Sequence, residues 1–319
     1  MKHSLKSRLI AALAAGILVT SGVAAQEVGP VYVVGDSVND TGTFAPVTLT
    51  GRFTTTPGLL WTEIVAGAFG GSVAPAYFFD GESFFRNPGG TNYAQSGALI
   101  SVEQGLYDGH SRPVSWQVDR LLEHTGGDLS GSIVLMDGGG PDVVLAAVLT
   151  QQGQLTPEQA MEQVATAGRA LANEAKRVAD AGPESIVLFG VANFGSTPMF
   201  GAGQDETSAY LTALSQAFNA AFALEAQEIS LNAIMPDVYR FFDTVIADPA
   251  AYGLQNVTEP AVHPERANPT PTGNSANSSP FHLVEANAAQ TYLFADGLHP
   301  SGRGHELLGA FILTQLESQ

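Results

Sequence analysis

Residues 31–40 read Val-Tyr-Val-Val-Gly-Asp-Ser-Val-Asn-Asp, a short apolar run followed by a polar turn. Four strand-favouring residues that end at a glycine predict a buried β-strand over Val31–Val34. Ser37 therefore follows the carboxyl end of a strand, where open α/β sheets bind their ligands. Because Gly-Asp-Ser is also ordinary turn chemistry, a functional role for this hydroxyl needs support from elsewhere in the chain.

The rest of the chain alternates strand and helix signals without a repeat. Apolar runs predict further buried strands over residues 133–136 and 186–191, with additional strands in 232–236 and within 72–79. Helical periodicity marks residues 58–69, 115–124, 157–180, 208–229 and 302–316. Strands separated by helices predict one three-layer α/β/α domain, an α/β fold with a mainly parallel central sheet.

A base and an acid that could serve Ser37 lie far downstream. The chain reads Asp296-Gly297-Leu298-His299-Pro300 just before the last helical segment. A serine nucleophile needs a base to take its proton, and the base needs an acid to fix its tautomer. His299 and Asp296 supply these two groups.

Two small-residue stretches lie between the nucleophile and this pair. Residues 92–98 read Asn-Tyr-Ala-Gln-Ser-Gly-Ala, and residues 138–142, Gly-Gly-Gly-Pro-Asp, end the apolar run 133–136. Glycine-rich turns at strand ends expose backbone N–H groups, which a developing oxyanion requires.

These four blocks, in this order, resemble those of the GDSL, or SGNH, serine esterase and lipase family. Arg52-Phe53-Thr54-Thr55 and the stretch 248–253 also resemble its secreted bacterial lipase/phospholipase-like branch. The resemblance implies an SGNH-hydrolase, flavodoxin-like fold in which Ser37, Asp296 and His299 form the catalytic triad. It also implies an oxyanion hole made by the backbone N–H groups of Ser37 and Gly97.

One position departs from the family pattern. Where the family has Gly-x-Asn-Asp, with the asparagine as third oxyanion donor, this chain has Gly139-Gly140-Pro141-Asp142. Proline offers neither a side-chain donor nor a backbone N–H, although it suits the first turn of a helix. Asn39 and Asn193 are the nearest candidates for a substitute donor.

The first residues have the pattern of a secretory signal. Residues 1–25 combine a basic start, an apolar run from Leu9 to Val19 and a small-residue end, which predicts cleavage before Gln26. We therefore expect an exported protein, periplasmic or extracellular, with a single hydrolase domain over 26–319; an uncleaved membrane anchor is the alternative. An exported chain of this size can fold without disulfides, and the sequence has no cysteine.

The chain is strongly acidic. The formal net charge is −18, and it becomes −21 without residues 1–25, which hold three basic residues and no acidic one. A single lysine and nine scattered arginines would remain, so we expect no nucleic-acid partner. Solubility is the simplest interpretation of this acidity.

Residues 248–290 stand outside the pattern, with six prolines and no sustained periodicity. We expect a long loop, either disordered or bordering the acyl pocket, in which case Tyr252, Phe281 and Tyr292 could line that pocket. His305 follows His299 on the next helix, where we expect a surface or capping role. The other histidines lack the spacing of a metal site.

We therefore predict a carboxylic-ester hydrolase that needs no cofactor or metal and acts on a small-molecule or lipid ester. One alternative is a catalytically decayed, ligand- or glycan-binding relative, and another is an acyltransferase that uses the same residues. The sequence leaves the acyl-chain preference and the oligomeric state open.

Overall fold

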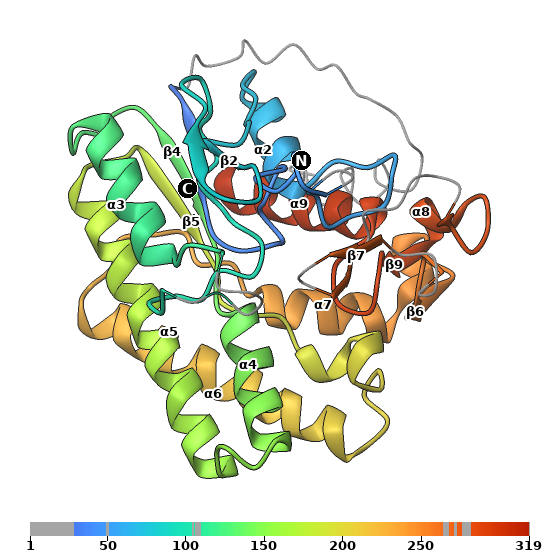
Figure 1. The fold of residues 1–319 in the computed structure, drawn as a ribbon. Helices are drawn as coiled ribbons and strands as arrows, with labels where there is room; N and C mark the ends of the chain where they lie inside the picture. Colours follow the sequence, from blue (N-terminus) through green and yellow to red (C-terminus); the bar gives the residue numbers. More distant parts are fainter. Residues whose placement is uncertain are drawn as a thin grey trace, which may run out of the picture.

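A parallel sheet at the centre of the molecule is built from the predicted apolar runs. The computed structural model describes residues 29–48, 51–103, 105, 110–263, 268–270, 273–275 and 282–318. Strands β1 (Val31–Val34), β4 (Ile133–Met136) and β5 (Ser185–Leu188) pair in parallel in the order β1-β4-β5 (Figure 1). The first two match the predicted ranges, and β5 ends earlier than predicted.

Isolated bridges extend this sheet at both edges. Asn92 pairs in parallel with Val33 of β1, and Ile234 pairs in parallel with Val187 of β5. The sequence order across the sheet is therefore second, first, third, fourth, fifth, as in flavodoxin-like folds. The order reverses between β1 and β4, and in such sheets ligands bind outside the carboxyl ends of the strands at this switch point.

Helices cover both faces of the sheet, since successive strand residues point to opposite sides. Val34, Val134 and Met136 pack in one core cluster with residues of α3 (Val114–Thr125), α4 (Gly140–Gln151), α5 (Pro157–Asp180) and α6 (Glu206–Glu228). Val33, Ile133 and Leu135 pack in a second cluster with residues of α2 (Trp61–Ala68), α7 (Val238–Ala247) and α9 (Gly302–Leu316). The molecule thus has the predicted three layers.

Capping residues in the sequence mark where two of the helices begin. In α5, Thr156 caps the helix and forms a capping box with Gln159; in α9, the Ser301 side chain accepts from the N–H of Gly304. The helices are α2 (Trp61–Ala68), α3 (Val114–Thr125), α4 (Gly140–Gln151), α5 (Pro157–Asp180), α6 (Glu206–Glu228), α7 (Val238–Ala247), α8 (Ala288–Thr291) and α9 (Gly302–Leu316), with 3-10 turns η1 (Phe194–Ser196), η2 (Pro198–Phe200) and η3 (Pro249–Tyr252).

Three helices, α4, α7 and the four-residue α8, were not among the predicted segments. Helix α4 begins at the proline-containing turn, as proline there suggested, but its residues are apolar nearly all round because it packs against both α5 and α6. Helix α7 has only ten residues and depends on Asp237, whose side chain caps it by accepting from the N–H of Arg240.

The segment 72–79 contributes only in part to the sheet. Pro75 bridges to Asn92 in parallel, and the chain then forms an antiparallel hairpin of β2 (Tyr77–Phe79) and β3 (Phe84–Arg86). The prediction for 232–236 is met by the single bridge at Ile234.

Residues 248–290 are not one irregular loop. Strand β6 (Asn256–Pro260) pairs in parallel with β9 (Tyr292–Phe294), and β7 (Asn268–Thr270) pairs with β8 (Gly273–Ser275). Phe281 lies outside the described residues, as do residues 1–25 with the predicted signal. No helix in the described ranges is long and apolar enough to span a membrane.

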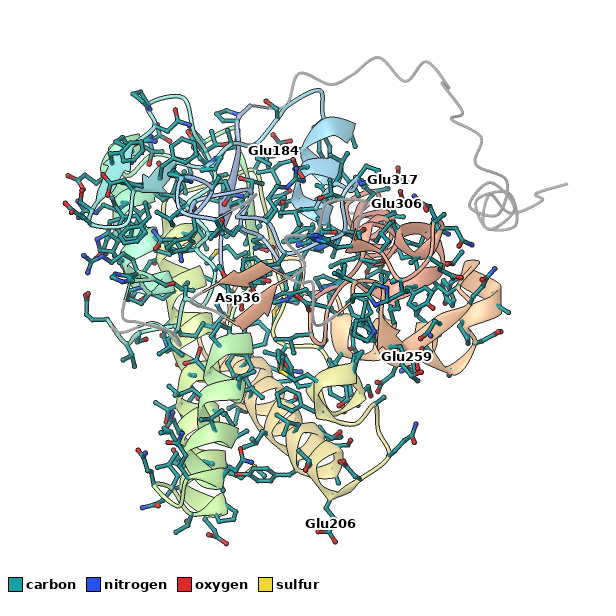
Figure 2. All side chains as sticks on the ribbon, turned by 45° about the vertical axis from the view of Figure 1, so that its right-hand side comes forward. Asp36, Glu184, Glu206, Glu259, Glu306 and Glu317 are labelled. Atoms are coloured by element: carbon teal, nitrogen blue, oxygen red, sulfur yellow. The ribbon has the colours of Figure 1, made fainter. Side chains whose placement is uncertain are left out.

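The acidic surface charge is spread over many elements. Glu184, Glu206, Glu259, Glu306 and Glu317 are all exposed and lie at the periphery of the molecule, whereas Asp36 lies in its interior (Figure 2).

Candidate active site

Ser37 sits in a tight turn directly after β1. The carboxylate of Asp36 accepts from the N–H of Val38 (3.2 Å), and Asp36 itself donates its N–H to Asp137 Oδ1 (3.2 Å). Gly35 adopts φ +150°, and a Cβ there would lie 1.9 Å from Asp137 Oδ1. Only glycine therefore lets the end of β4 approach the nucleophile turn so closely.

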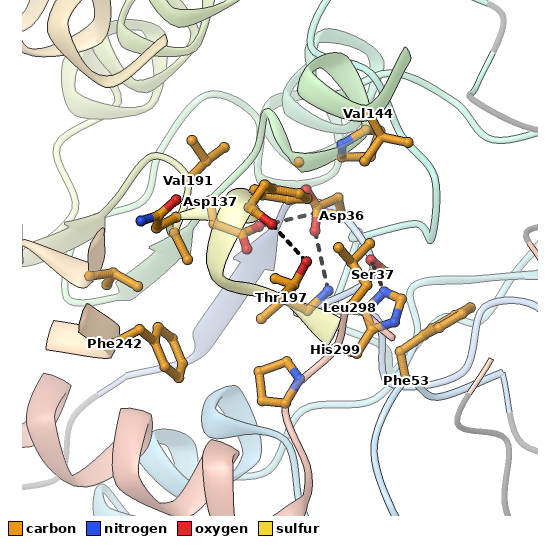
Figure 3. Close-up of a pocket in the computed structure, with 18 of the residues that line it drawn as sticks. Asp36, Ser37, Phe53, Asp137, Val144, Val191, Thr197, Phe242, Leu298 and His299 are labelled. Atoms are coloured by element: carbon orange, nitrogen blue, oxygen red, sulfur yellow. Dashed lines mark hydrogen bonds between the residues drawn. The ribbon is translucent and has the colours of Figure 1, made fainter. Parts of the chain in front are cut away.

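His299 contacts Ser37, and Asp296 contacts His299. His299 Nε2 lies 2.8 Å from Ser37 Oγ, and His299 Nδ1 lies 2.8 Å from Asp296 Oδ2 (Figure 3). Asp296 Oδ1 also accepts from the backbone N–H groups of Leu298 (2.8 Å) and His299 (2.7 Å). The structure thus brings together the three residues that the motifs singled out.

These contacts determine the charge state of Asp296. Burial opposes ionisation of its carboxyl group, but the His299 ring and the N–H groups of His299 and Leu298 outweigh it. The pKa of Asp296 is therefore below its ordinary value, and the group is a carboxylate at neutral pH. A carboxylate beside Nδ1 favours the tautomer with the proton on Nδ1, which leaves the lone pair of Nε2 facing Ser37 Oγ.

The loop that carries His299 is held from two sides. A turn closes where the N–H of Ala295 donates to the carbonyl of His299 (2.7 Å). The ring of Phe53 packs on the imidazole, with 4.6 Å between the ring centroids. Phe53 belongs to the Arg52-Phe53-Thr54-Thr55 block, so this block contributes a side chain to the site.

Gly97 lines the same pocket as Ser37, on the loop after the Asn92 bridge. The preceding residue, Ser96, donates its N–H to Asp40 Oδ2 (2.8 Å), and Asp40 follows the nucleophile turn. Asp40 also accepts from the N–H groups of Gly42 and Thr43. This carboxyl group therefore links the loops of Ser37 and Gly97, and burial raises its pKa to about 6.

Pro141 also lines the pocket, at the first turn of α4. Gly139 caps this helix with φ +103°, where a Cβ would lie 2.2 Å from Phe218 Cζ. The turn is therefore shaped by packing against α6 and brings a residue without any N–H donor to the pocket wall.

Both asparagines proposed as substitute donors are held by bonds to other residues. Asn39 is fully buried; its Nδ2 donates to the carbonyl of Val34 (3.0 Å) and its Oδ1 accepts from Trp61 Nε1 (2.7 Å). Asn193 lines the pocket; its Nδ2 donates to Asp243 (3.3 Å) and its Oδ1 accepts from Thr212 (2.8 Å). Asn39 is excluded because it does not line the pocket, whereas Asn193 is anchored by these two bonds and keeps a second N–H on Nδ2.

A cavity of about 150 Å³ opens beside Ser37 and His299 and runs into the face of the sheet that carries α7 and α9. Its wall is mainly apolar and includes Phe189, Val191, Phe242, Ile246, Phe294 and Leu308. None of the described residues in 248–290, Tyr252 included, lines it. Tyr252 instead packs against the core of α7 and α9.

Buried carboxyl groups lie on the other side of Ser37. The pKa of Asp36 is above its ordinary value because burial raises it. The N–H of Val38, the His299 ring and the N–H groups of Gly140 and Ser37 lower it by less. Burial and the neighbouring Asp36 hold the pKa of Asp137 well above its usual range. No group of three or more acidic or histidine side chains in the described ranges could hold a metal ion.

His305 is not at the surface, contrary to expectation. It is 0% exposed, and its Nδ1 accepts from the N–H of Trp61 (3.3 Å) at the start of α2. Burial lowers its pKa to about 3, so the ring is neutral at physiological pH. It therefore caps a neighbouring helix rather than its own.

Comparison with known families agrees with this geometry. The model of the GDSL-like lipases and acylhydrolases matches residues 31–312, which include Ser37, Gly97, Asp296 and His299. The chain belongs to this family. No curated protein matches the chain. Membership of the GDSL-like family supports a hydrolase of the esterase or lipase type.

Three residues of the site are not predicted by the motifs. Phe53 and Ser96 lie inside motif blocks that do not indicate their contacts, and Asp137 lies outside the motifs. A signal existed for Asp137, since it directly follows a buried strand next to the nucleophile strand.

Proposed function

We propose that this protein hydrolyses carboxylic esters by way of an acyl-enzyme on Ser37. Ser37 Oγ attacks the ester carbonyl carbon while its proton passes to His299 Nε2, and the carbonyl π electrons move onto oxygen. Collapse of this intermediate expels the alcohol, which takes the proton from His299. Water then attacks the acyl-enzyme and gives its proton to His299. The second intermediate expels Ser37 Oγ, which takes this proton back from His299, and the acid is released.

The observation that carries this proposal is a pair of contacts, one between Ser37 and His299 and one between His299 and Asp296. The Ser37 Oγ–His299 Nε2 and His299 Nδ1–Asp296 Oδ2 distances are both 2.8 Å. These distances allow proton transfer from serine to histidine, and the lowered pKa of Asp296 favours the charged imidazolium that results. The N–H groups of Ser37 and Gly97 would bind the oxyanion.

The pocket suggests the kind of ester. Its apolar wall between β5, α7 and α9 suits an uncharged acyl chain. Asp36, Asp137, Asp243 and Asp296 line it, and no lysine or arginine of the described ranges does. We therefore propose neutral esters with an apolar acyl part as substrates.

The proposal includes export, directed by residues 1–25 to the periplasm or the extracellular space, because their composition is that of a secretory signal. Amino-terminal sequencing of protein recovered outside the cytoplasm should begin at Gln26. Recovery of only uncleaved, membrane-bound protein would contradict this part.

The catalytic part is tested by the kinetics of Ser37→Ala on p-nitrophenyl esters of increasing acyl length. The variant should lose kcat/KM by roughly 10⁵-fold or more, because without the nucleophile no acyl-enzyme forms. Ser130→Ala, at an exposed serine, is the matched control and should retain wild-type turnover. Undiminished hydrolysis by Ser37→Ala would remove the assignment, and a wild type without hydrolytic activity would favour the ligand-binding alternative.

A further inference from the structure

The hydroxyl of Ser96 is buried in the active-site wall without a hydrogen-bond partner. Ser96 is 1% exposed and lines the same pocket as Ser37, Gly97 and Pro141. Its Oγ makes no hydrogen bond to any described residue. It is the residue directly before Gly97, the proposed oxyanion donor.

Every other polar group of Ser96 is engaged. Its N–H donates to Asp40 Oδ2 (2.8 Å), and its carbonyl accepts from the hydroxyl of Ser111. These two bonds fix the backbone between the nucleophile loop and the start of α3. The backbone of Ser96 is thus fixed in the pocket wall, and its buried hydroxyl has its hydrogen-bonding capacity unused.

An unpartnered buried hydroxyl costs folding free energy that an alanine would not. Buried polar groups are nearly always paired, so an exception in an active-site wall suggests that its partner arrives with the substrate. The same pocket lacks an asparagine at the family position of the third oxyanion donor, because Pro141 stands there. Asn39 does not line the pocket, and Asn193 is anchored by its bonds to Asp243 and Thr212.

We propose that the Ser96 hydroxyl is the third oxyanion donor of this enzyme. The inference rests on the proposed ester hydrolysis. When Ser37 attacks, the carbonyl oxygen gains the π electron pair, and Ser96 Oγ–H donates a hydrogen bond to it alongside the N–H groups of Ser37 and Gly97. Ser96 keeps its own proton throughout, since the proton of Ser37 moves to His299.

A double-mutant cycle between Ser96 and Pro141 tests this role. Ser96→Ala should lower kcat by roughly 10²-fold, the usual loss for one oxyanion donor, with little change in KM. Pro141→Asn alone should change kcat by less than about 10-fold, because three donors are already present. Adding Pro141→Asn to Ser96→Ala should bring kcat back to within about 10-fold of the wild type, because the new amide supplies the lost bond.

A binding measurement gives a second readout. A trifluoromethyl ketone forms a hemiketal oxyanion on the serine, so its inhibition constant should rise for Ser96→Ala by about the same factor as kcat falls. The thermal midpoint of Ser96→Ala should be unchanged or higher, because a hydroxyl without a partner is removed. Ser96→Gly is the second variant if Ser96→Ala does not fold.

Thr62→Val is the matched control. Thr62 Oγ1 is also buried and without a described partner, but it lies on α2 and does not line the pocket, so kcat should remain at the wild-type value. A folded Ser96→Ala with kcat within about threefold of the wild type, or equal losses in both Pro141 backgrounds, would overturn the inference. A wild type that does not hydrolyse esters, or whose hydrolysis does not depend on Ser37, would overturn the proposed function itself.

Discussion

Asp296 and His299 are joined by three hydrogen bonds, and this arrangement should make activity depend on one protonation state. His299 can accept the Ser37 proton only while Nε2 carries a lone pair. We therefore expect His299→Ala to abolish activity.

Asp296→Asn should cost roughly 10⁴-fold in kcat, because the amide no longer selects the tautomer with the proton on Nδ1. Steady-state kinetics of the two variants measure both effects. A folded His299→Ala or Asp296→Asn variant with wild-type turnover would exclude this mechanism.

Asp142 gives the stability of the fold a pH dependence of known sign. Burial raises its pKa to about 7; the N–H of Ile100 opposes this shift and the charge of Asp36 adds to it. In the unfolded chain an aspartate titrates near pH 4. Between these values the folded protein holds a proton that the unfolded chain has lost, so the stabilisation is complete below about pH 4 and is lost as the pH rises through about 7.

Asp142→Asn cannot titrate and keeps an oxygen that can accept from Ile100. The free energy of unfolding of the wild type, minus that of the variant, should therefore decrease by roughly 4 kcal/mol between about pH 4 and about pH 8. Urea unfolding at a series of pH values measures it. A difference that stays constant, or increases with pH, would show that Asp142 is ionised in the folded state.

At the scale of elements, α9 and the segment that precedes α2 are held together behind the site. His305 on α9 accepts from Trp61, and Thr55 Oγ1 accepts from the N–H of Gly302 (2.8 Å). This segment also carries Phe53, whose ring packs on His299.

His305→Ala should lower the free energy of unfolding by roughly 3 kcal/mol, because it opens a cavity and leaves the Trp61 N–H buried without a partner. Thermal and urea unfolding measure the loss. Glu306→Ala, at the exposed neighbouring residue, should change stability by no more than about 0.5 kcal/mol. Equal effects of the two substitutions would show that the buried contact contributes little.

The elements that sequence predicts well carry their own signals. Helices α5 and α9 begin where the sequence predicts, because Thr156 and Ser301 cap their N-termini locally. Helix α4 is buried between two other helices, so its apolar residues show no helical face. The parallel pairing of β6 with β9 is a tertiary contact that the proline-rich segment does not reveal.

The residues of the site also differ in how well the sequence predicts them. Ser37, Asp296 and His299 could be found because each lies in a short motif at the end of a strand or before a helix. The states of Asn193 and His305 could not, because they depend on distant partners, Asp243 and Trp61 respectively. Whether a buried polar group is free or engaged is decided by packing across the fold.

At the scale of the whole molecule, the negative charge of the protein should disfavour negatively charged substrates. The net charge is −18, and four carboxyl groups line the pocket. At equal acyl length, an ester with a terminal carboxylate on its acyl chain should show a kcat/KM at least about 10-fold below that of the neutral ester. The difference in kcat/KM between the two esters should decrease at high salt. It should also decrease in Asp243→Asn, which removes one carboxyl group from the pocket wall. Equal rates for both esters would contradict this electrostatic selection.

Covalent labelling with a fluorophosphonate, followed by peptide mass spectrometry, tests the role of Ser37 most directly. A serine activated by a neighbouring histidine should be phosphonylated at a single site. We predict one adduct, on the peptide that contains Ser37, and none in Ser37→Ala. An adduct on a different serine, or undiminished labelling of Ser37→Ala, would contradict the account.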